Sequence, residues 1–295
     1  MRILISGASG FLGSHVVPFL QERGHAVIQL TRSPSQPEDV EWHPAQGKIE
    51  AAKLPHLDAV LHLAGENIAN GLWTEAKRQR IRDSRVQSTQ LLSETLASLS
   101  PCPTVFLTAS AVGYYGNRGD QLLTEESESG EGFLADVCRQ WEAATLPAAQ
   151  AGIRTIFLRN GLVLAAKEGA LGRIILPFKL GLGGQIGDGQ QYWSWISITD
   201  WLYAVLHCLT TETLSGPVNT TAPQPVRNRE FTKTLGRILN RPTLVPVPKF
   251  AIRLILGQMA DEMLLASARV IPSRLQASGY TFFHPTLHEA LQSLL

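Results

Sequence analysis

Short apolar runs alternate with longer stretches of helical periodicity through the first two-thirds of the chain. The runs are rich in β-branched residues and predict strands near 2–6, 26–31, 58–63, 103–109 and 154–159. Helical spacing predicts helices near 11–23, 73–99 and 132–151, and a further apolar helix near 200–212. Because alternating strands and helices build right-handed βαβ units, the pattern predicts an α/β fold with a doubly wound parallel sheet of the Rossmann type.

Breaks in this pattern indicate the domain organisation. Gly24 and Gly152 stand where a C-terminal cap would end a helix, and residues 33–57 lack a long helical pattern and predict a hairpin or a loop crossover. After residue 160 the alternation gives way to a glycine-rich stretch and then to short helical patterns separated by prolines. We therefore expect the α/β domain to extend over 1–222, with 161–195 contributing to a substrate lobe, and a smaller, mostly helical lobe over 223–295.

Composition narrows the class of partner. The 295 residues carry a formal charge of +1, so nothing directs the chain towards nucleic acid or an anionic membrane. Cys102, Cys138 and Cys208 are far apart and odd in number, which argues against a disulfide framework and a zinc site. The apolar run at the N-terminus is too short for a signal peptide or a spanning helix. We expect a cytoplasmic protein that binds small molecules, and the sequence carries no signal for an oligomeric state.

A glycine-rich turn carries the main functional argument. The strand at 2–6 runs into the segment 7–13, GASGFLG, and then into helical spacing. Glycines there allow a sharp turn, close approach of a pyrophosphate to the backbone, and packing of the helix on the strand, while the helix N-terminus offers free amides. An ordinary βα turn is the alternative, but the context favours a dinucleotide site. The residues expected to line it are Gly7, Ser9, Gly10, Phe11, Leu12 and Gly13.

The end of the second strand indicates which dinucleotide is bound. A protein that binds NAD usually offers an acid to the adenine ribose about 20 residues beyond the glycines. The segment 29–33 reads QLTRS instead, with no carboxylate to repel a 2′-phosphate. Thr31 and Arg32 therefore predict NADP (NADPH), with Arg32 pairing with the phosphate, although a solvent-facing arginine is the alternative.

The spacing G-x-x-G-x-x-G resembles that of the extended and atypical short-chain dehydrogenases/reductases, in the sugar-nucleotide epimerase/dehydratase branch. More narrowly, the segments LAGENI at 63–68, Ser84-Arg85, SWI at 194–196 and the tail from Pro223 to Leu291 resemble the "epimerase family protein" group, which has a dedicated C-terminal domain. The resemblance covers nearly the whole chain. It implies an NAD(P)-binding Rossmann domain and oxidoreductase or epimerase activity.

The resemblance also implies further cofactor-binding residues. Leu63, Ala64 and Gly65 would flank the adenine and ribose, and Val163 would line the nicotinamide pocket. Arg78, Arg82 and Arg85 share one helical face, which is usually solvated. Of this helix, the resemblance implies a contact with the cofactor only for the pair Ser84-Arg85.

The catalytic groups are less clear, because the pair Tyr-x-x-x-Lys of this superfamily is absent. None of the five tyrosines has a lysine four residues later, and Phe133 and Val137 hold the expected spacing. The segment 108–116, TASAVGYYG, resembles the strand-end motif of the family. Ser110 would hold a substrate oxygen and Tyr114 or Tyr115 would donate a proton, while simple packing of the two rings is the alternative.

Other candidates have plainer explanations. Glu66 is a candidate for the substrate pocket, whereas His62 on an apolar strand predicts a core histidine. Asp200 or Thr199 is expected to cap the helix that follows. Two aromatic residues of the glycine-rich stretch, Tyr192 and Trp195, are expected to form a pocket wall rather than core. No cluster has the spacing of a metal site.

Two functions remain open from the sequence. The first is an NADP-dependent oxidoreductase or epimerase that acts on a small, unidentified substrate. The second is a non-catalytic NADP-binding sensor or scaffold, which the missing tyrosine and lysine favour.

Overall fold

A computed structural model describes residues 1–166 and 168–295. The chain forms two compact units that are interleaved along the sequence. The first comprises 1–110, 137–158 and 205–217, and the second 111–136, 159–204 and 218–295. These units divide the chain differently from the boundary that we placed at residue 222, because the second unit joins 111–136 and 159–204 to the C-terminal residues. It therefore includes the segment 161–195 that we assigned to the substrate lobe.

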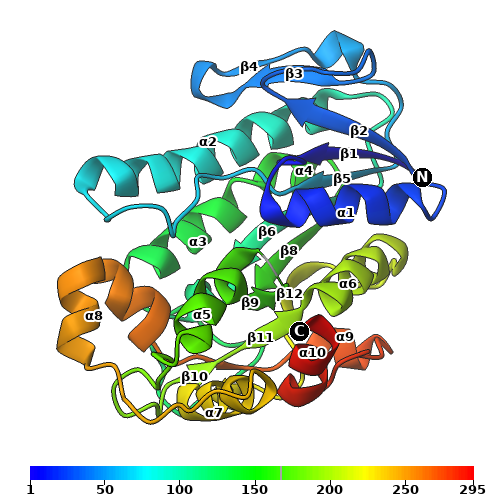
Figure 1. The fold of residues 1–295 in the computed structure, drawn as a ribbon. Coiled ribbons are helices and arrows are strands. Elements are labelled where there is room, and N and C mark those ends of the chain that lie inside the picture. Colours follow the sequence, from blue (N-terminus) through cyan, green and yellow to red (C-terminus); the bar gives the residue numbers. More distant parts are fainter. Residues whose placement is uncertain (167) are drawn as a thin grey trace. The chain divides into compact units, whose positions relative to one another are not determined.

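The main sheet has eight strands in the order β12-β8-β6-β5-β1-β2-β3-β4 (Figure 1). Their bounds are Arg2–Ser6 (β1), Ala26–Thr31 (β2), Val40–His43 (β3), Lys48–Ile49 (β4), Ala59–His62 (β5), Val105–Ala111 (β6), Arg154–Asn160 (β8) and Gly216–Thr220 (β12). Strand β1 pairs in parallel with β2 on one side and β5 on the other. The chain therefore winds outward from β1 in both directions, which is the order reversal of a Rossmann sheet. The expected fold class is confirmed, as are all five predicted strands.

Ten α-helices are present in the part of the chain that the structure describes. They are Phe11–Gln21 (α1), Glu75–Ser98 (α2), Phe133–Ala143 (α3), Leu146–Gln150 (α4), Gly169–Lys179 (α5), Ile198–Thr210 (α6), Asn228–Ile238 (α7), Lys249–Leu256 (α8), Ser273–Ala277 (α9) and Leu287–Leu294 (α10). Gly24 and Gly152 have φ of 79° and 84°, as expected after a helix end. The hairpin expected within 33–57 is formed by β3 and β4, which pair antiparallel.

The helix predicted at 132–151 is divided, and this part of the prediction is wrong. Helix α3 ends at Ala143 and α4 begins at Leu146. Pro147 lacks an N–H and cannot continue the hydrogen-bond ladder of the preceding turn. Thr145 instead turns its hydroxyl back to the carbonyl oxygen of Glu142, 2.8 Å away.

The first unit has its own core, in which His62 is a polar member. Its imidazole is fully buried, with Nδ1 2.5 Å from the Ser6 hydroxyl and Nε2 3.1 Å from the Ser88 hydroxyl. Because the Ser88 hydroxyl already donates to the carbonyl oxygen of Ser84, Nε2 donates to Ser88 and Nδ1 accepts from Ser6. Burial, followed by the charge of Arg85, lowers the pKa of His62 to about 3. The prediction of a core histidine is confirmed.

The second unit holds short strands and the C-terminal helices. Parallel strands Leu162–Leu164 (β9) and Trp195–Ser197 (β11) pair with each other, as do Leu122–Leu123 (β7) and Arg269–Val270 (β14). Tyr192–Trp193 (β10) pairs antiparallel with Val226–Arg227 (β13). The core of this unit joins residues of α5, β11, α7 and α10.

Asp200 does not cap helix α6, and Thr199 does not either. The cap is Ser197, whose hydroxyl oxygen accepts from the backbone N–H of Asp200 at 3.0 Å. The buried carboxylate of Asp200 instead accepts from the backbone N–H groups of Phe283 and His284 at 2.8 and 3.0 Å, so it anchors the C-terminal segment within the second unit.

None of the helices within residues 1–166 and 168–295 is both long and apolar enough to cross a membrane.

The buried His62 predicts a loss of stability in acid. The folded protein keeps His62 neutral, whereas the unfolded chain protonates it near its ordinary pKa of 6.5, so stability falls as pH drops from 6.5 towards 3. At pH 4.5 the loss from this one group is about 2–3 kcal/mol in the free energy of unfolding. Urea unfolding at pH 7 and 4.5 measures it. His62→Gln should be less stable at pH 7 but lose less on acidification, and an equal loss in both proteins would contradict this assignment.

Candidate functional site

In the glycine turn at the end of β1, backbone atoms pack directly against other backbone atoms. The whole turn lies in the first unit. Gly7 has φ of +75°, and a Cβ there would stand 2.8 Å from the backbone nitrogen of Ala64. A Cβ on Gly13 would stand 2.1 Å from the carbonyl oxygen of Gly7. Both glycines are therefore required by the turn itself. Gly10 differs, because a Cβ there would meet only the Gly7 carbonyl oxygen, at 3.2 Å.

Helix α1 begins directly after this turn without a capping side chain. Gly10 is its N-cap residue, and no side chain accepts from the first turn. Ser9 and Gly10 are exposed, and Phe11 and Leu12 are half-buried. The amides of a first helical turn have no partner within the helix, so an anion at this point would find donors and the positive end of the helix dipole.

Strand β2 ends beside this turn in the parallel pairing with β1. Thr31 accepts a hydrogen bond from the backbone N–H of Ser33 at 3.3 Å, which bends the chain as it leaves the strand. Arg32 follows and is exposed. Its guanidinium is the charged group of the segment 29–33, where an NAD-binding protein would offer a carboxylate.

Glu66 attaches the loop after β5 to helix α2. Its carboxylate accepts from the buried Lys77 ammonium at 2.6 Å, and its backbone N–H donates to the Ser84 hydroxyl at 2.9 Å. The hydrogen bond from Lys77 lowers the pKa of Glu66. Glu66 is thus an anchor of the loop as well as a candidate for the pocket. Lys77, eleven residues away, carried no signal in the sequence that would have paired it with Glu66.

Arg85 completes this attachment. Its Nη1 donates to the carbonyl oxygens of Glu66 and Ile81, both at 3.1 Å, and its guanidinium lies 5.0 Å from the ring centroid of Trp141 on α3. A Cβ on Gly65 would stand 3.3 Å from the Arg85 Cζ, so the glycine makes room for this side chain. Burial lowers the pKa of Arg85 to about 10, which leaves it cationic at neutral pH. Arg85 is therefore buried and does not lie on a solvated helical face.

Ser110 lies near the end of β6 and is bound to helix α3. Its hydroxyl donates to the Glu142 carboxylate at 2.7 Å, and only 3% of Ser110 is exposed. Helix α3 is where the tyrosine and lysine of the superfamily were expected. Glu142 was not identified from the sequence, because its contact with Ser110 joins residues 32 positions apart.

The two tyrosines of the TASAVGYYG segment belong to the second unit and differ in environment. Tyr115 is fully buried, and its hydroxyl donates to the Asn219 side-chain oxygen at 2.7 Å and accepts from Arg159 at 3.0 Å. Burial raises the pKa of Tyr115 to about 12. Tyr114 is half-buried, and the Arg159 guanidinium lies 3.5 Å from its ring centroid. Of the pair, Tyr114 is the better placed to meet a substrate.

The aromatic residues expected to form a pocket wall separate into two groups. Trp195 is wholly buried in the core of the second unit, and its indole N–H donates to the carbonyl oxygen of Gln224 at 3.0 Å, so the expectation that it lines a pocket rather than the core is wrong. Tyr192 is half-buried, with the guanidinium groups of Arg227 and Arg269 at 4.5 and 5.2 Å from its ring centroid. Val163 is buried on β9, where it pairs with Ile196.

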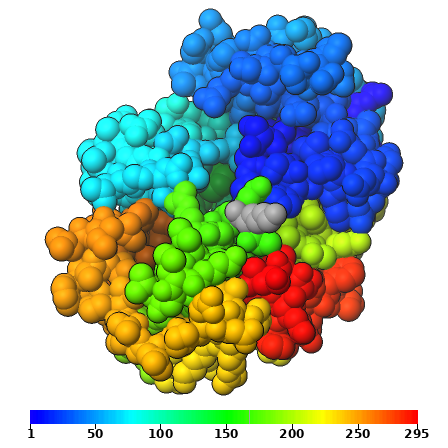
Figure 2. All heavy atoms as spheres, in the orientation of Figure 1, coloured from blue at the N-terminus to red at the C-terminus, as the bar shows by residue number. Residues whose placement is uncertain are grey.

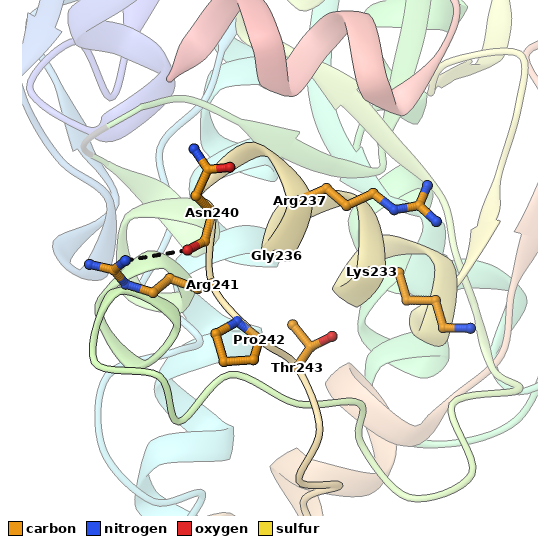
Figure 3. A pocket seen from close by; sticks show the side chains of 7 residues that line it. All are labelled: Lys233, Gly236, Arg237, Asn240, Arg241, Pro242 and Thr243. Atoms are coloured by element: carbon orange, nitrogen blue, oxygen red, sulfur yellow. Dashed lines mark hydrogen bonds between the residues drawn. The ribbon is translucent and has the colours of Figure 1, made fainter.

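Two cavities are lined by other residues. One of about 490 Å³ is at the end of α7, lined by Lys233, Gly236, Arg237, Asn240, Arg241, Pro242 and Thr243 (Figure 3). Figure 3 shows Lys233 and Arg237 extending away from Arg241, so the three cations do not converge on one point. Another, of about 660 Å³, lies against the β3–β4 hairpin. Within the described residues, no group of His, Cys, Asp or Glu is arranged to hold a metal ion.

Comparison with known families agrees with the sheet order and the glycine turn. Residues 3–219 match the NAD dependent epimerase/dehydratase family, and residues 247–294 match a domain of unknown function, DUF1731. An "epimerase family protein" of Mycobacterium leprae is 43% identical over 290 residues, which cover 98% of this chain and 94% of the relative.

Two solved structures extend the likeness. The human epimerase family protein SDR39U1, crystallised with NADPH, has 34% identity and a TM-score of 0.92, and the match covers 100% of this chain and 99% of that one. A nucleoside-diphosphate sugar epimerase from Corynebacterium glutamicum has 37% identity and a TM-score of 0.84, and this chain matches 58% of its length. The chain therefore belongs to the NAD dependent epimerase/dehydratase family and carries a DUF1731 domain at its C-terminal end.

Proposed function

We propose that the protein is an NADPH-dependent oxidoreductase or epimerase that acts on a small substrate. The observation that carries this proposal is Arg32, which is exposed at the end of β2 where an acid would select NAD. The uncapped N-terminus of α1 beside the glycine turn supports it, since both the pyrophosphate and the 2′-phosphate would then meet positive charge. The NADPH in the human relative points the same way.

The residues of the first unit would hold the cofactor in a defined order. The amides of α1 would bind the pyrophosphate, Arg32 the 2′-phosphate, and the segment 63–65 the adenine and ribose. Arg85 would place a fixed positive charge beside that segment. In a reduction, bound NADPH would supply the hydride to a carbonyl carbon, whereas in an epimerisation bound NADP⁺ would take a hydride from the substrate and return it.

The proton would come from a group other than a tyrosine paired with lysine. Tyr115 is unsuited, because its hydroxyl is engaged by Asn219 and Arg159 and its pKa is raised to about 12. Ser110 would orient a substrate oxygen, held in place by Glu142. Tyr114 would donate or accept the proton, with Arg159 as the cation against its ring.

The surroundings of Tyr192 support a substrate that carries an anionic group. Two guanidinium groups flank one ring, and Arg227 pairs with the carboxylate of Asp120 at 2.8 Å, whereas Arg269 forms no ion pair with any of the described residues. Neighbouring like charges repel unless an anion lies between them. A phosphate or carboxylate on the substrate would meet this requirement.

A non-catalytic NADPH-binding sensor or scaffold is the second candidate. The absence of Tyr-x-x-x-Lys and the burial of Tyr115 favour it.

A hydride-transfer experiment distinguishes the enzyme from the non-catalytic sensor. NADPH labelled with deuterium at C4 of the nicotinamide should pass the label to a metabolite in a cell extract if the protein is an enzyme. Ser110→Ala and Tyr114→Phe should each slow transfer about 100-fold or more, while Tyr203→Phe should not. Absence of label transfer by the wild type would favour the sensor.

Arg32→Asp should reverse or erase the cofactor preference. The wild type should bind NADPH about ten- to hundred-fold more tightly than NADH, because a charge-assisted hydrogen bond contributes about 1.5–3 kcal/mol. The substituted aspartate would repel the 2′-phosphate and accept from the ribose hydroxyls of NADH. Isothermal titration with both cofactors measures the effect, with Arg229→Asp as a control of equal charge change. Equal wild-type affinities for the two cofactors would overturn the assignment.

Gly10→Val should abolish binding of both cofactors in a folded protein. The space above Gly10 is open apart from the Gly7 carbonyl oxygen, so a side chain there would fill the volume that a pyrophosphate needs. Gly13→Val should instead lower the thermal midpoint, because its Cβ would overlap the Gly7 carbonyl oxygen. Titration and thermal melting distinguish the two effects. Normal NADPH affinity in folded Gly10→Val would show that the turn serves only the fold.

A further inference from the structure

The loop that follows β2 is exposed along its whole length, yet it ends on a buried carboxylate. Every residue from 32 to 38 is exposed, so no apolar side chain anchors the loop. Asp39, which directly precedes β3, is only 3% exposed. Figure 2 shows the blue part of the chain that includes β3 and β4 at the surface of the first unit. A carboxylate is buried at a high cost unless donors satisfy it, so its partners indicate its role.

The Asp39 carboxylate closes the loop into a turn. Its Oδ2 accepts from the backbone N–H groups of Ser35 and Gln36 at 2.9 and 3.0 Å, and from the Ser35 hydroxyl at 3.3 Å. The backbone N–H of Asp39 donates to the carbonyl oxygen of Gln36 at 3.1 Å. Hydrogen bonds to an ionised acceptor are stronger than those between neutral groups. The turn over 35–39 is therefore held by one side chain rather than by packing.

Both ends of the loop are fixed to the sheet. The residue after Asp39 begins β3, which pairs with the end of β2. At the other end, the backbone N–H of Ser33 donates to the Thr31 hydroxyl at 3.3 Å. Pro34 restricts the backbone between these two restraints, because its ring locks φ. Arg32 thus lies in a short segment whose path is set before any ligand binds.

We propose that Asp39 is a positioning residue for the 2′-phosphate of NADPH, an inference that rests on the proposed role of Arg32. By holding the turn over 35–39, Asp39 keeps the Arg32 guanidinium where it meets the phosphate. A prearranged loop spares the cofactor the cost of ordering it. NADH has no 2′-phosphate, so its affinity does not depend on this arrangement. The charge of Asp39 does not oppose the phosphate, because the side chain is buried and its Oδ2 is engaged by donors of the loop.

Removal of the carboxylate should weaken NADPH binding without changing that of NADH. Asp39→Ala should lower the NADPH affinity about ten-fold, the loss expected if the freed loop keeps the binding arrangement about a tenth of the time. Asp39→Asn should restore most of the affinity, since its amide oxygen can accept from the same donors. Isothermal titration with both cofactors measures this. Adenosine 2′,5′-bisphosphate and adenosine 5′-monophosphate, which differ only by the 2′-phosphate, should show the same contrast.

Asp58→Ala is the matched control. The Asp58 carboxylate also accepts from a backbone N–H, that of Arg2 at 2.6 Å. It directly precedes β5, so it lies at the opposite end of the parallel strands from the loop, and its loss should leave both affinities unchanged. Hydrogen exchange in the wild type gives a test that needs no variant to fold. The amides of Ser35 and Gln36 should be protected in the free protein as well as with NADPH.

Four results would overturn the role of Asp39 while leaving the proposed function in place. They are an unchanged NADPH preference in folded Asp39→Ala, an equal loss for both cofactors, tighter NADPH binding by Asp39→Asn, and rapid exchange of both amides in the free protein. The second would show that Asp39 serves only the fold, and the third that its charge opposes the phosphate. A wild type without any preference for NADPH would overturn the proposed function and this inference together.

Discussion

At the end of β1 the backbone of Gly7 lies so close to the backbone of residues 63 and 64 that no side chain fits between them. This contact sets the distance between the turn before α1 and the loop after β5, the two segments that we propose to bind the cofactor. From it follow the direction in which helix α1 starts and the path of the loop after β5. Glu66 of that loop is then held by Lys77, Ser84 and Arg85. One close approach between two strand ends thus positions a helix N-terminus, a loop and a cation.

In both units an arginine places positive charge against an aromatic ring. In the first unit Arg85 reaches from α2 to Trp141, and in the second Arg159 lies against Tyr114 and donates to Tyr115. A guanidinium keeps its charge through the physiological range even when buried, whereas a buried ammonium gives up its proton readily. Arg85 illustrates this, since burial lowers its pKa only to about 10. These groups therefore supply constant electrostatic potential rather than proton exchange.

Periodicity and glycine placement predicted the sheet, most of the helices and the glycine turn after β1, because each of these depends on residues close together in sequence. The side-chain contacts that define the rest join distant positions. Glu142 accepts a hydrogen bond from Ser110, and Asp200 accepts one from the backbone N–H of Phe283. No local sequence pattern predicts either contact. Trp195 was misassigned for a related reason. Its glycine-rich neighbourhood is typical of a pocket, yet the strand that it occupies faces α7 and α10, which the local sequence does not reveal. The break between α3 and α4 differs from these cases, because Pro147 is a local signal in the sequence that indicates the end of a helix.

The interleaving of the two units limits how the chain could be shortened or recombined. The core around Trp195 is closed by Phe231 and Leu235 from α7 and by Leu287 and Leu291 from α10. A gene fragment that stopped after β12 would encode half of that core and none of its cover, and its product would expose the indole and its neighbours to water. The C-terminal region is therefore not a module that can be exchanged between proteins on its own. Substitutions in 159–204 that alter the volume of this core would therefore need matching substitutions in the tail to keep it packed.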